Sequence, residues 1–66
     1  MKKIENIHNS LINGQRKQAV KQIDDYGKYD FWEDYEKFLD DTYANRAVSC
    51  GHFMELTISY FRIKNR

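Results

Sequence analysis

The sequence predicts an all-α fold: one compact domain, residues 1–66, of three or four helices that begins with a helical hairpin. Three observations support this prediction. The chain contains no proline, and its isolated glycines, Gly14, Gly27 and Gly51, separate periodic segments. Glycine is common just beyond the end of a helix. Within the segments, apolar residues recur every three or four positions, which is the period of a helix with one buried face.

The opening hairpin is expected from residues 2–13 and 15–26. Gly14 separates the two segments and Gly27 follows the second. A connection this short favours two antiparallel helices. The apolar stripes that we expect in the core consist of Ile4, Ile7, Leu11, Ala19, Val20 and Ile23.

The third helix is expected over residues 30–46, which include most of the stretch YDFWEDYEKFLDD at positions 29–41. Asp30 with Glu33 three residues later resembles a capping box, which makes Asp30 the predicted N-cap. At helical spacing the aromatic rings and the acids of this stretch fall on opposite sides. We therefore expect a core helix with an acidic outer face. Its predicted core residues are Phe31, Tyr35, Phe38 and Leu39.

Residues 51–64 contain two competing patterns. Apolar and polar residues alternate from Met54 to Tyr60, which is typical of a strand. However, Glu55, Ser59 and Arg62 form a polar stripe at helical spacing, and the basic residues near the C-terminus suit the helix dipole. We favour a helix with Ser49 as its N-cap and keep the strand as the alternative. The core residues expected from this segment are Met54, Ile58 and Phe61.

Composition restricts location and chemistry. The single cysteine, Cys50, cannot form an intrachain disulfide, which argues against an oxidised secreted protein. Glu5 and His8 interrupt any apolar core of a signal peptide, and no apolar run approaches the ~18 residues that span a bilayer. We therefore expect a soluble, cytoplasmic protein with no membrane partner.

We expect no enzymatic activity, cofactor or metal. His8 and His52 are far apart in the sequence, and no serine or cysteine lies in a recognised nucleophile motif. Cys50 and His52 offer two metal ligands, whereas a structural zinc site normally takes four. Adjacent carboxylates on a helix point in different directions, and nothing in the sequence marks a pocket around them.

Charge is distributed unevenly along the chain. Residues 1–28 carry a net charge of +3, residues 29–41 of −5 and residues 42–66 of +3, which sum to +1. The acidic middle segment predicts a surface for a protein or nucleoprotein partner with a basic surface. In a plainer interpretation, these acids only keep an aromatic-rich protein soluble. The predicted partner-binding residues are Trp32, Glu33, Asp34, Glu36, Asp40 and Asp41.

Two other functions remain open at this stage. The basic segment GQRKQAVKQ places Arg16, Lys17 and Lys21 where they are able to contact nucleic-acid phosphates. Alternatively, the aromatic surplus serves a structural homodimer, so the chain is expected to be a monomer or a homodimer.

Two resemblances accompany these patterns. Gly14, Ala19 and Ile23 in NGQRKQAVKQI resemble the turn and second helix of a tetratricopeptide repeat, which implies a tight helical hairpin. In size and style, the chain resembles the small helical inhibitor proteins of phages and mobile elements, of the anti-CRISPR or anti-restriction type. That resemblance implies a non-catalytic inhibitor that occupies the nucleic-acid-binding surface of a host defence nucleoprotein.

Overall fold

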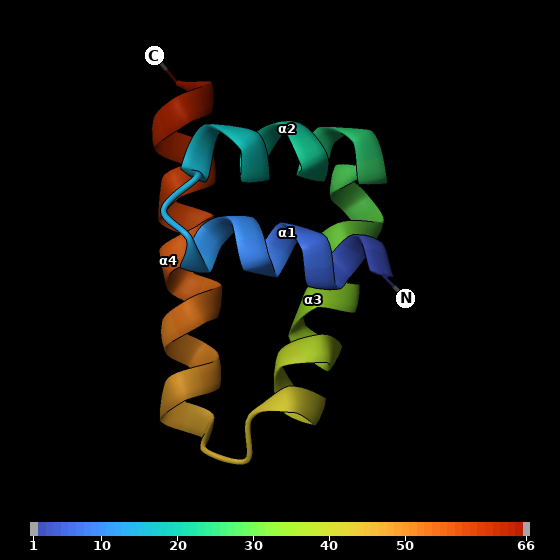
Figure 1. Cartoon of the computed structure of the whole chain (residues 1–66), viewed down its shortest axis with the longest axis vertical. Coiled ribbons are helices and arrows are strands. Elements are labelled where there is room, and N and C mark those ends of the chain that lie inside the picture. The colour runs from blue at the N-terminus through green and yellow to red at the C-terminus, as the bar shows by residue number, and fades with distance from the viewer. Residues whose placement is uncertain (1, 66) are drawn as a thin grey trace.

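Four α-helices joined by three short connections make up the fold in the computed structural model, which describes residues 2–65. The helices are α1 (Lys2–Ile12), α2 (Arg16–Tyr26), α3 (Lys28–Thr42) and α4 (Arg46–Lys64). Figure 1 shows two antiparallel hairpins, α1–α2 and α3–α4, with the first lying across the second. The predicted all-α class and opening hairpin are confirmed, and residues 54–60 are helical rather than extended.

Gly27 alone connects α2 to α3. Its N–H donates to the carbonyl oxygen of Ile23 at 3.0 Å, which ends α2, and its own carbonyl accepts from the N–H of Phe31 at 2.9 Å, which begins α3. The φ angle of Gly27 is +111°, a value that side-chain-bearing residues rarely adopt. α3 therefore begins at Lys28, and the prediction that Asp30 is its N-cap is wrong because Asp30 lies in the first turn.

α4 begins five residues earlier than predicted. The side-chain oxygen of Asn45 accepts a hydrogen bond from the N–H of Ala47 at 2.8 Å, so Asn45 is the N-cap. Ser49, the predicted cap, instead lies inside the helix and is buried. Gly51 also lies inside α4 and does not separate helices. α3 correspondingly ends at Thr42, four residues short of its predicted end.

The core lies between the two hairpins, and the predictions for α1, α2 and α3 are largely confirmed. Phe38 is the exception among them, because it is only partly buried and packs against the edge of the core. Phe31 and Tyr35 are fully buried and stack with their ring centroids 5.1 Å apart. The buried apolar residues are Ile4, Ile7, Leu11, Ala19, Val20, Ile23, Phe31, Tyr35, Leu39, Leu56 and Tyr60.

The predicted inner face of α4 is wrong. Met54, Ile58 and Phe61 are 61%, 47% and 53% exposed, whereas Leu56 and Tyr60 are buried. Apolar residues occupy two opposite sides of α4, with Met54, Ile58 and Phe61 on one and Leu56, Tyr60 and Ile63 on the other. Their period therefore does not select the side that turns inward. Despite this composition, no helix in residues 2–65 combines the length and apolarity needed to cross a bilayer.

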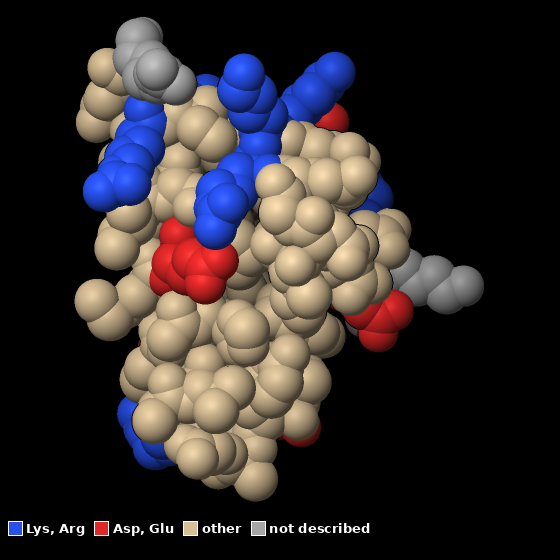
Figure 2. All heavy atoms as spheres, turned by 60° about the vertical axis from the view of Figure 1, so that its left-hand side comes forward, with Lys and Arg blue, Asp and Glu red and all other residues tan. Residues whose placement is uncertain are grey.

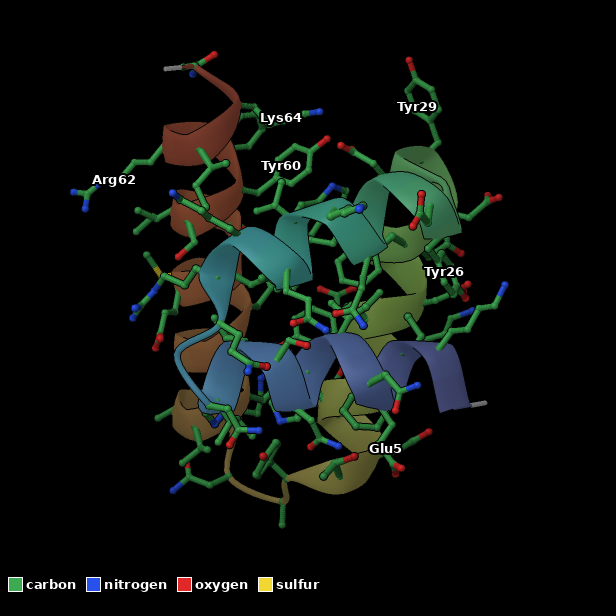
Figure 3. The ribbon with its side chains drawn as sticks, turned by 45° about the horizontal axis from the view of Figure 1, so that its top comes forward. Glu5, Tyr26, Tyr29, Tyr60, Arg62 and Lys64 are labelled. Carbon is green, nitrogen blue, oxygen red and sulfur yellow. The ribbon has the colours of Figure 1, made fainter. Side chains whose placement is uncertain are left out.

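Polar contacts with α2 accompany the observed orientation of α4. Lys64 Nζ lies 2.6 Å from Asp24 Oδ2, and the Tyr60 hydroxyl donates to Asp24 Oδ1 at 3.0 Å. Nearer the middle of α4, Arg16 of α2 pairs with Glu55 at 3.2 Å. In Figure 3, Tyr60 and Lys64 point from α4 toward the middle of the molecule, while Arg62 points away from it.

Candidate interaction surface on α3 and α4

The acids of α3 lie on its solvent side, opposite the buried rings. Glu33, Glu36, Asp40 and Asp41 are exposed, and Asp34 is partly buried. One basic residue, Lys37, lies among them and pairs with Glu33 at 3.7 Å across one helical turn. This pair forms a ridge along α3, and the remaining acids fall on its two sides.

On the α1 side of the ridge, Asp34 is engaged within the fold. The hydroxyl of Tyr26 donates to Asp34 Oδ2 at 2.6 Å. This hydrogen bond, which the neutral phenol makes, is the main reason that the pKa of Tyr26 is raised. Asp41 lies along the same shallow hollow, whose apolar members are Ile4 and Phe38. This edge of α3 lies against α1. Since Asp34 already accepts a hydrogen bond from Tyr26, Asp41 is the acid on this edge that a partner could contact.

On the α4 side of the ridge, Glu36 and Asp40 border a groove of about 180 Å³ between α3 and α4. Asp40 Oδ1 accepts a hydrogen bond from the buried Ser49 hydroxyl at 3.1 Å, which fixes this carboxylate at the edge of the groove. One basic residue, Arg46, lies along the groove. Its apolar and thiol members are Leu39, Cys50, Phe53 and Met54. Two carboxylates thus lie beside the apolar residues of this groove.

Trp32 lies in the seam between the two helices. Its ring centroid is 5.7 Å from that of Phe53 and 5.6 Å from that of Tyr60, both in edge-to-face geometry. The side chain is only partly buried, so one part of the indole packs between α3 and α4 and the rest reaches the surface. Trp32 therefore packs mainly within the fold, and only part of its indole is available to a partner.

The basic residues of α2 are all exposed, but they differ in their contacts. Arg16 is turned toward α4 by its ion pair with Glu55. Lys17 and Lys21 are exposed one turn apart, and no ion pair joins either of them to another described residue. The nucleic-acid site predicted from these three residues stays a prediction. Arg16 and Lys17 line one shallow hollow, Arg16 and Arg62 line another, and Figure 2 shows basic side chains gathered over the upper part of the face that it brings forward.

The structure brings together four residues that the sequence did not connect. His8 is buried, and its Nδ1 and Nε2 lie 2.9 Å from the Tyr35 hydroxyl and 2.8 Å from the Tyr43 hydroxyl. The His52 ring lies edge-on to His8 with centroids 5.1 Å apart. Burial, with a smaller contribution from His52, lowers the pKa of His8 below its ordinary value of 6.5.

This cluster lies at the edge of the core, since His8 and Tyr35 are buried whereas Tyr43 and His52 are partly buried. A neutral imidazole has one donor and one acceptor nitrogen, so it satisfies both tyrosine hydroxyls in either tautomer. The only sequence signal was the position of His8 on the edge of the apolar stripe in the first helix. Within residues 2–65, no three His, Cys, Asp or Glu side chains are grouped so that they could hold a metal ion.

Comparison of the chain with protein-family models, with curated proteins and with solved structures gave no match.

Proposed function

We propose that the chain is a non-catalytic protein-interaction module that binds a basic, amphipathic segment of its partner in the groove between α3 and α4. The observation that carries the proposal is the placement of Glu36 and Asp40 beside the apolar residues of this groove. Cationic side chains of the partner would contact these carboxylates while its apolar side chains enter the groove. Aromatic and methionine side chains of this kind are frequent at binding surfaces.

Electrostatics favours a protein partner over nucleic acid. The outer side of α3 carries acids with Lys37 as the single base among them, so its local field repels phosphates and attracts Lys and Arg. A basic surface that binds this row of carboxylates would no longer be free for nucleic acid. The module would then act as an inhibitor of a nucleoprotein, such as a host defence complex opposed by a phage or mobile element.

The test uses a synthetic helical peptide with lysine on one face and leucine on the other. We expect isothermal titration calorimetry to detect binding to the full chain, and no binding of a counterpart with glutamate in place of lysine. The double variant Glu36→Gln/Asp40→Asn removes two charges but keeps an oxygen that accepts from Ser49. We expect it to bind the lysine peptide at least several-fold more weakly, because both charge contacts are lost.

A matched control removes the same charge elsewhere. Glu5→Gln/Asp25→Asn changes two exposed acids on α1 and α2, so it should bind the peptide like the unmodified chain. Equal losses in both variants would show that only net charge matters and would refute the groove. A mobility shift of a DNA or RNA probe by the chain alone, abolished by Lys17→Gln/Lys21→Gln, would instead support the nucleic-acid alternative.

A further inference from the structure

Basic side chains of α2 and α4 gather where the start of α2 packs against α4. We define the basic surface as Arg16, Lys17 and Lys21 of α2 with Arg62 of α4, all of which are exposed. Arg16 and Arg62 line one hollow of about 620 Å³, and Arg16 and Lys17 line a second of about 460 Å³. Ile63 also lines both hollows, so the two adjoin along the line where the helices meet.

The basic surface keeps a net positive charge in the folded chain. Among the described residues that line the two hollows, Glu55 is the one acid, and it pairs with Arg16 at 3.2 Å. Within residues 2–65 no ion pair joins Lys17, Lys21 or Arg62 to an acid. Four cations less one acid leave a local charge of +3, although the whole chain carries only +1.

The acids at the end of α2 are engaged elsewhere. Asp24 lies 2.6 Å from Lys64 and accepts a hydrogen bond from the Tyr60 hydroxyl at 3.0 Å. Asp25 borders a different hollow, between α1 and α2, where Lys3 is its basic neighbour. These carboxylates therefore leave the charge at the start of α2 largely uncompensated.

The cations of the basic surface face solvent and act together. Basic side chains gather at the upper end of the face in Figure 2, and Arg62 points away from the molecule in Figure 3. Charges within about 10 Å of one another are not fully screened at ordinary ionic strength. In the free chain these like charges repel one another, and an anionic ligand would replace that repulsion by attraction.

We infer that the basic surface binds the phosphate backbone of a nucleic-acid strand. The inference rests on the proposed function and extends it, since the groove would hold the protein component of a nucleoprotein while the basic surface contacts its nucleic acid. The two surfaces use different charged residues. Those of the groove are Glu36, Asp40 and Arg46, and none of them lines the hollows beside Arg16.

The side chains around the hollows suit phosphate and sugar oxygens. The guanidinium groups of Arg16 and Arg62 offer several donors in a planar fork that matches a phosphate. Gln15 and Gln18 line the same hollow as Lys17, and amide side chains commonly donate to phosphate and sugar oxygens. Contacts of this kind carry no sequence information, so we expect binding that does not depend on base sequence.

The charge density of a nucleic acid favours it over an acidic protein segment. A strand carries one negative charge for every nucleotide, so a short stretch reaches cations on both helices. Lys17 and Lys21 lie one helical turn apart, about 6 Å along α2, and neighbouring phosphates of one strand can pair with both. A protein segment needs an unbroken run of acids to do the same.

Fluorescence anisotropy of a labelled oligothymidine of twelve nucleotides tests the inference. We expect the full chain to bind this strand at low salt. The logarithm of the association constant should fall against the logarithm of salt concentration with a slope of about −2, because each of three phosphate contacts contributes about −0.7 on a single strand. Complexes with so few contacts dissociate during electrophoresis, so the measurement is made at equilibrium in solution.

The variant Lys17→Gln/Arg62→Gln takes one cation from each helix without changing the core. We expect its slope to flatten to about −0.7 and its binding at low salt to weaken roughly tenfold or more. Lys3→Gln/Lys37→Gln is the matched control, because it removes two exposed cations from α1 and α3. It should bind the strand like the unmodified chain. Far-UV circular dichroism should show equal helix content in all three.

Removal of the acid provides a test of opposite sign. Glu55→Gln raises the local charge and releases Arg16 from its ion pair. We expect the slope to steepen by about 0.7 and binding of the strand to strengthen. Glu5→Gln makes the same change of charge on the exposed side of α1 and should leave binding unchanged.

Two measurements distinguish the basic surface from the groove. The Lys17→Gln/Arg62→Gln variant should bind the lysine–leucine peptide like the unmodified chain. If the chain binds the peptide but not the oligothymidine, the inference is refuted and the groove stands. If the chain binds the oligothymidine but not the peptide, the proposed function is wrong, and the assignment of the basic surface to nucleic acid is supported.

Two further outcomes would overturn the inference. Equal losses in the Lys17→Gln/Arg62→Gln and Lys3→Gln/Lys37→Gln variants would show that only net charge matters. An oligoglutamate peptide with as many charges as the strand, if it competes equally well for the chain, would show that the basic surface takes an acidic protein segment. We expect the peptide to compete much more weakly.

Discussion

The outer faces of α3 and α4 differ in chemistry although the two helices form one hairpin. Apart from Tyr29, which is 87% exposed at its start, α3 turns its rings toward the core and its carboxylates mostly outward, so its amphipathic pattern identifies the buried side. α4 has apolar side chains on both sides and exposes Met54 and Phe61. A single chain thus presents an acidic helix face and an apolar helix face beside each other.

The difference shows what determines which side of each helix faces the core. The side of α3 that faces the core is set by its own sequence, because burying its carboxylates would carry a large desolvation cost. The side of α4 that faces the core depends on packing with its neighbours, where Leu56 and Tyr60 are buried. The contacts of Tyr60 and Lys64 with Asp24 and of Glu55 with Arg16 accompany this orientation. The opposite side, with Met54 and Phe61, stays exposed.

Two phenylalanines provide the strongest test of this contrast. Phe31 on α3 is fully buried, whereas Phe61 on α4 is 53% exposed. We expect Phe31→Ala to lower the free energy of unfolding by about 3–5 kcal/mol, as removal of a buried aromatic ring does. For a domain of this size such a loss approaches its whole stability.

Phe61→Ala should lower the free energy of unfolding by less than about 1 kcal/mol, because the ring is largely outside the core. Urea denaturation followed by circular dichroism measures both values. Equal losses from the two substitutions would contradict the assignment of the outer side of α4.

Acidification tests the interior that both helices share, where His8 meets Tyr35 and Tyr43. The folded-state pKa of His8 lies below its ordinary value of 6.5, so the unfolded chain binds a proton more readily than the folded one. Stability from this source is complete above about pH 7 and is lost as the pH falls below 6.5. Each unit of difference in pKa corresponds to about 1.4 kcal/mol.

The measurement is the free energy of unfolding between pH 7.5 and pH 5, with Trp32 fluorescence as the signal. His8→Gln keeps a donor and an acceptor but has no titrating ring, so its stability should change less across this range. The difference between the two chains reports His8 together with its charge interaction with His52. A stability that rises on acidification would contradict the neutral state of the buried imidazole.

Salt should test the proposed groove through a smaller effect. Raising the ionic strength from about 0.1 M to about 1 M shortens the screening length from ~10 Å to ~3 Å. Binding of the lysine–leucine peptide to the α3–α4 groove should weaken several-fold, since it depends on exposed carboxylates. The Glu36→Gln/Asp40→Asn variant, which lacks both groove charges, should show a smaller change. Titration calorimetry of both chains under the same two conditions provides the comparison.

Sequence patterns predicted the buried side of a helix correctly where polar and apolar residues occupy opposite sides of it. They identified the hairpin of α1 and α2 and the buried side of α3, including Phe31 and Tyr35. They failed at helix ends, because Asn45 and Ser49 are both suitable N-cap residue types and a glycine such as Gly51 occurs inside helices as well as beyond their ends. They also placed α4 with the wrong side inward, since both of its sides are apolar.

The candidate surface could be predicted only in part. The acids of α3 are visible in the sequence, but the groove depends on Glu36 and Asp40 lying beside Phe53 and Met54. That juxtaposition requires the α3–α4 hairpin to be closed. The contact between His8 of α1 and His52 of α4 likewise depends on tertiary packing, because the two residues are separated by most of the chain.

The short connections between the helices also bear on how fast the chain folds. A single residue, Gly27, joins α2 to α3, and each hairpin is assembled from neighbouring segments, so little loop entropy opposes closure. Helical proteins with such local topology reach the native state within microseconds to milliseconds. The chain contains no proline, and so lacks the slow isomerisation that delays many refolding reactions. We expect rapid refolding after dilution from denaturant, without a phase lasting seconds.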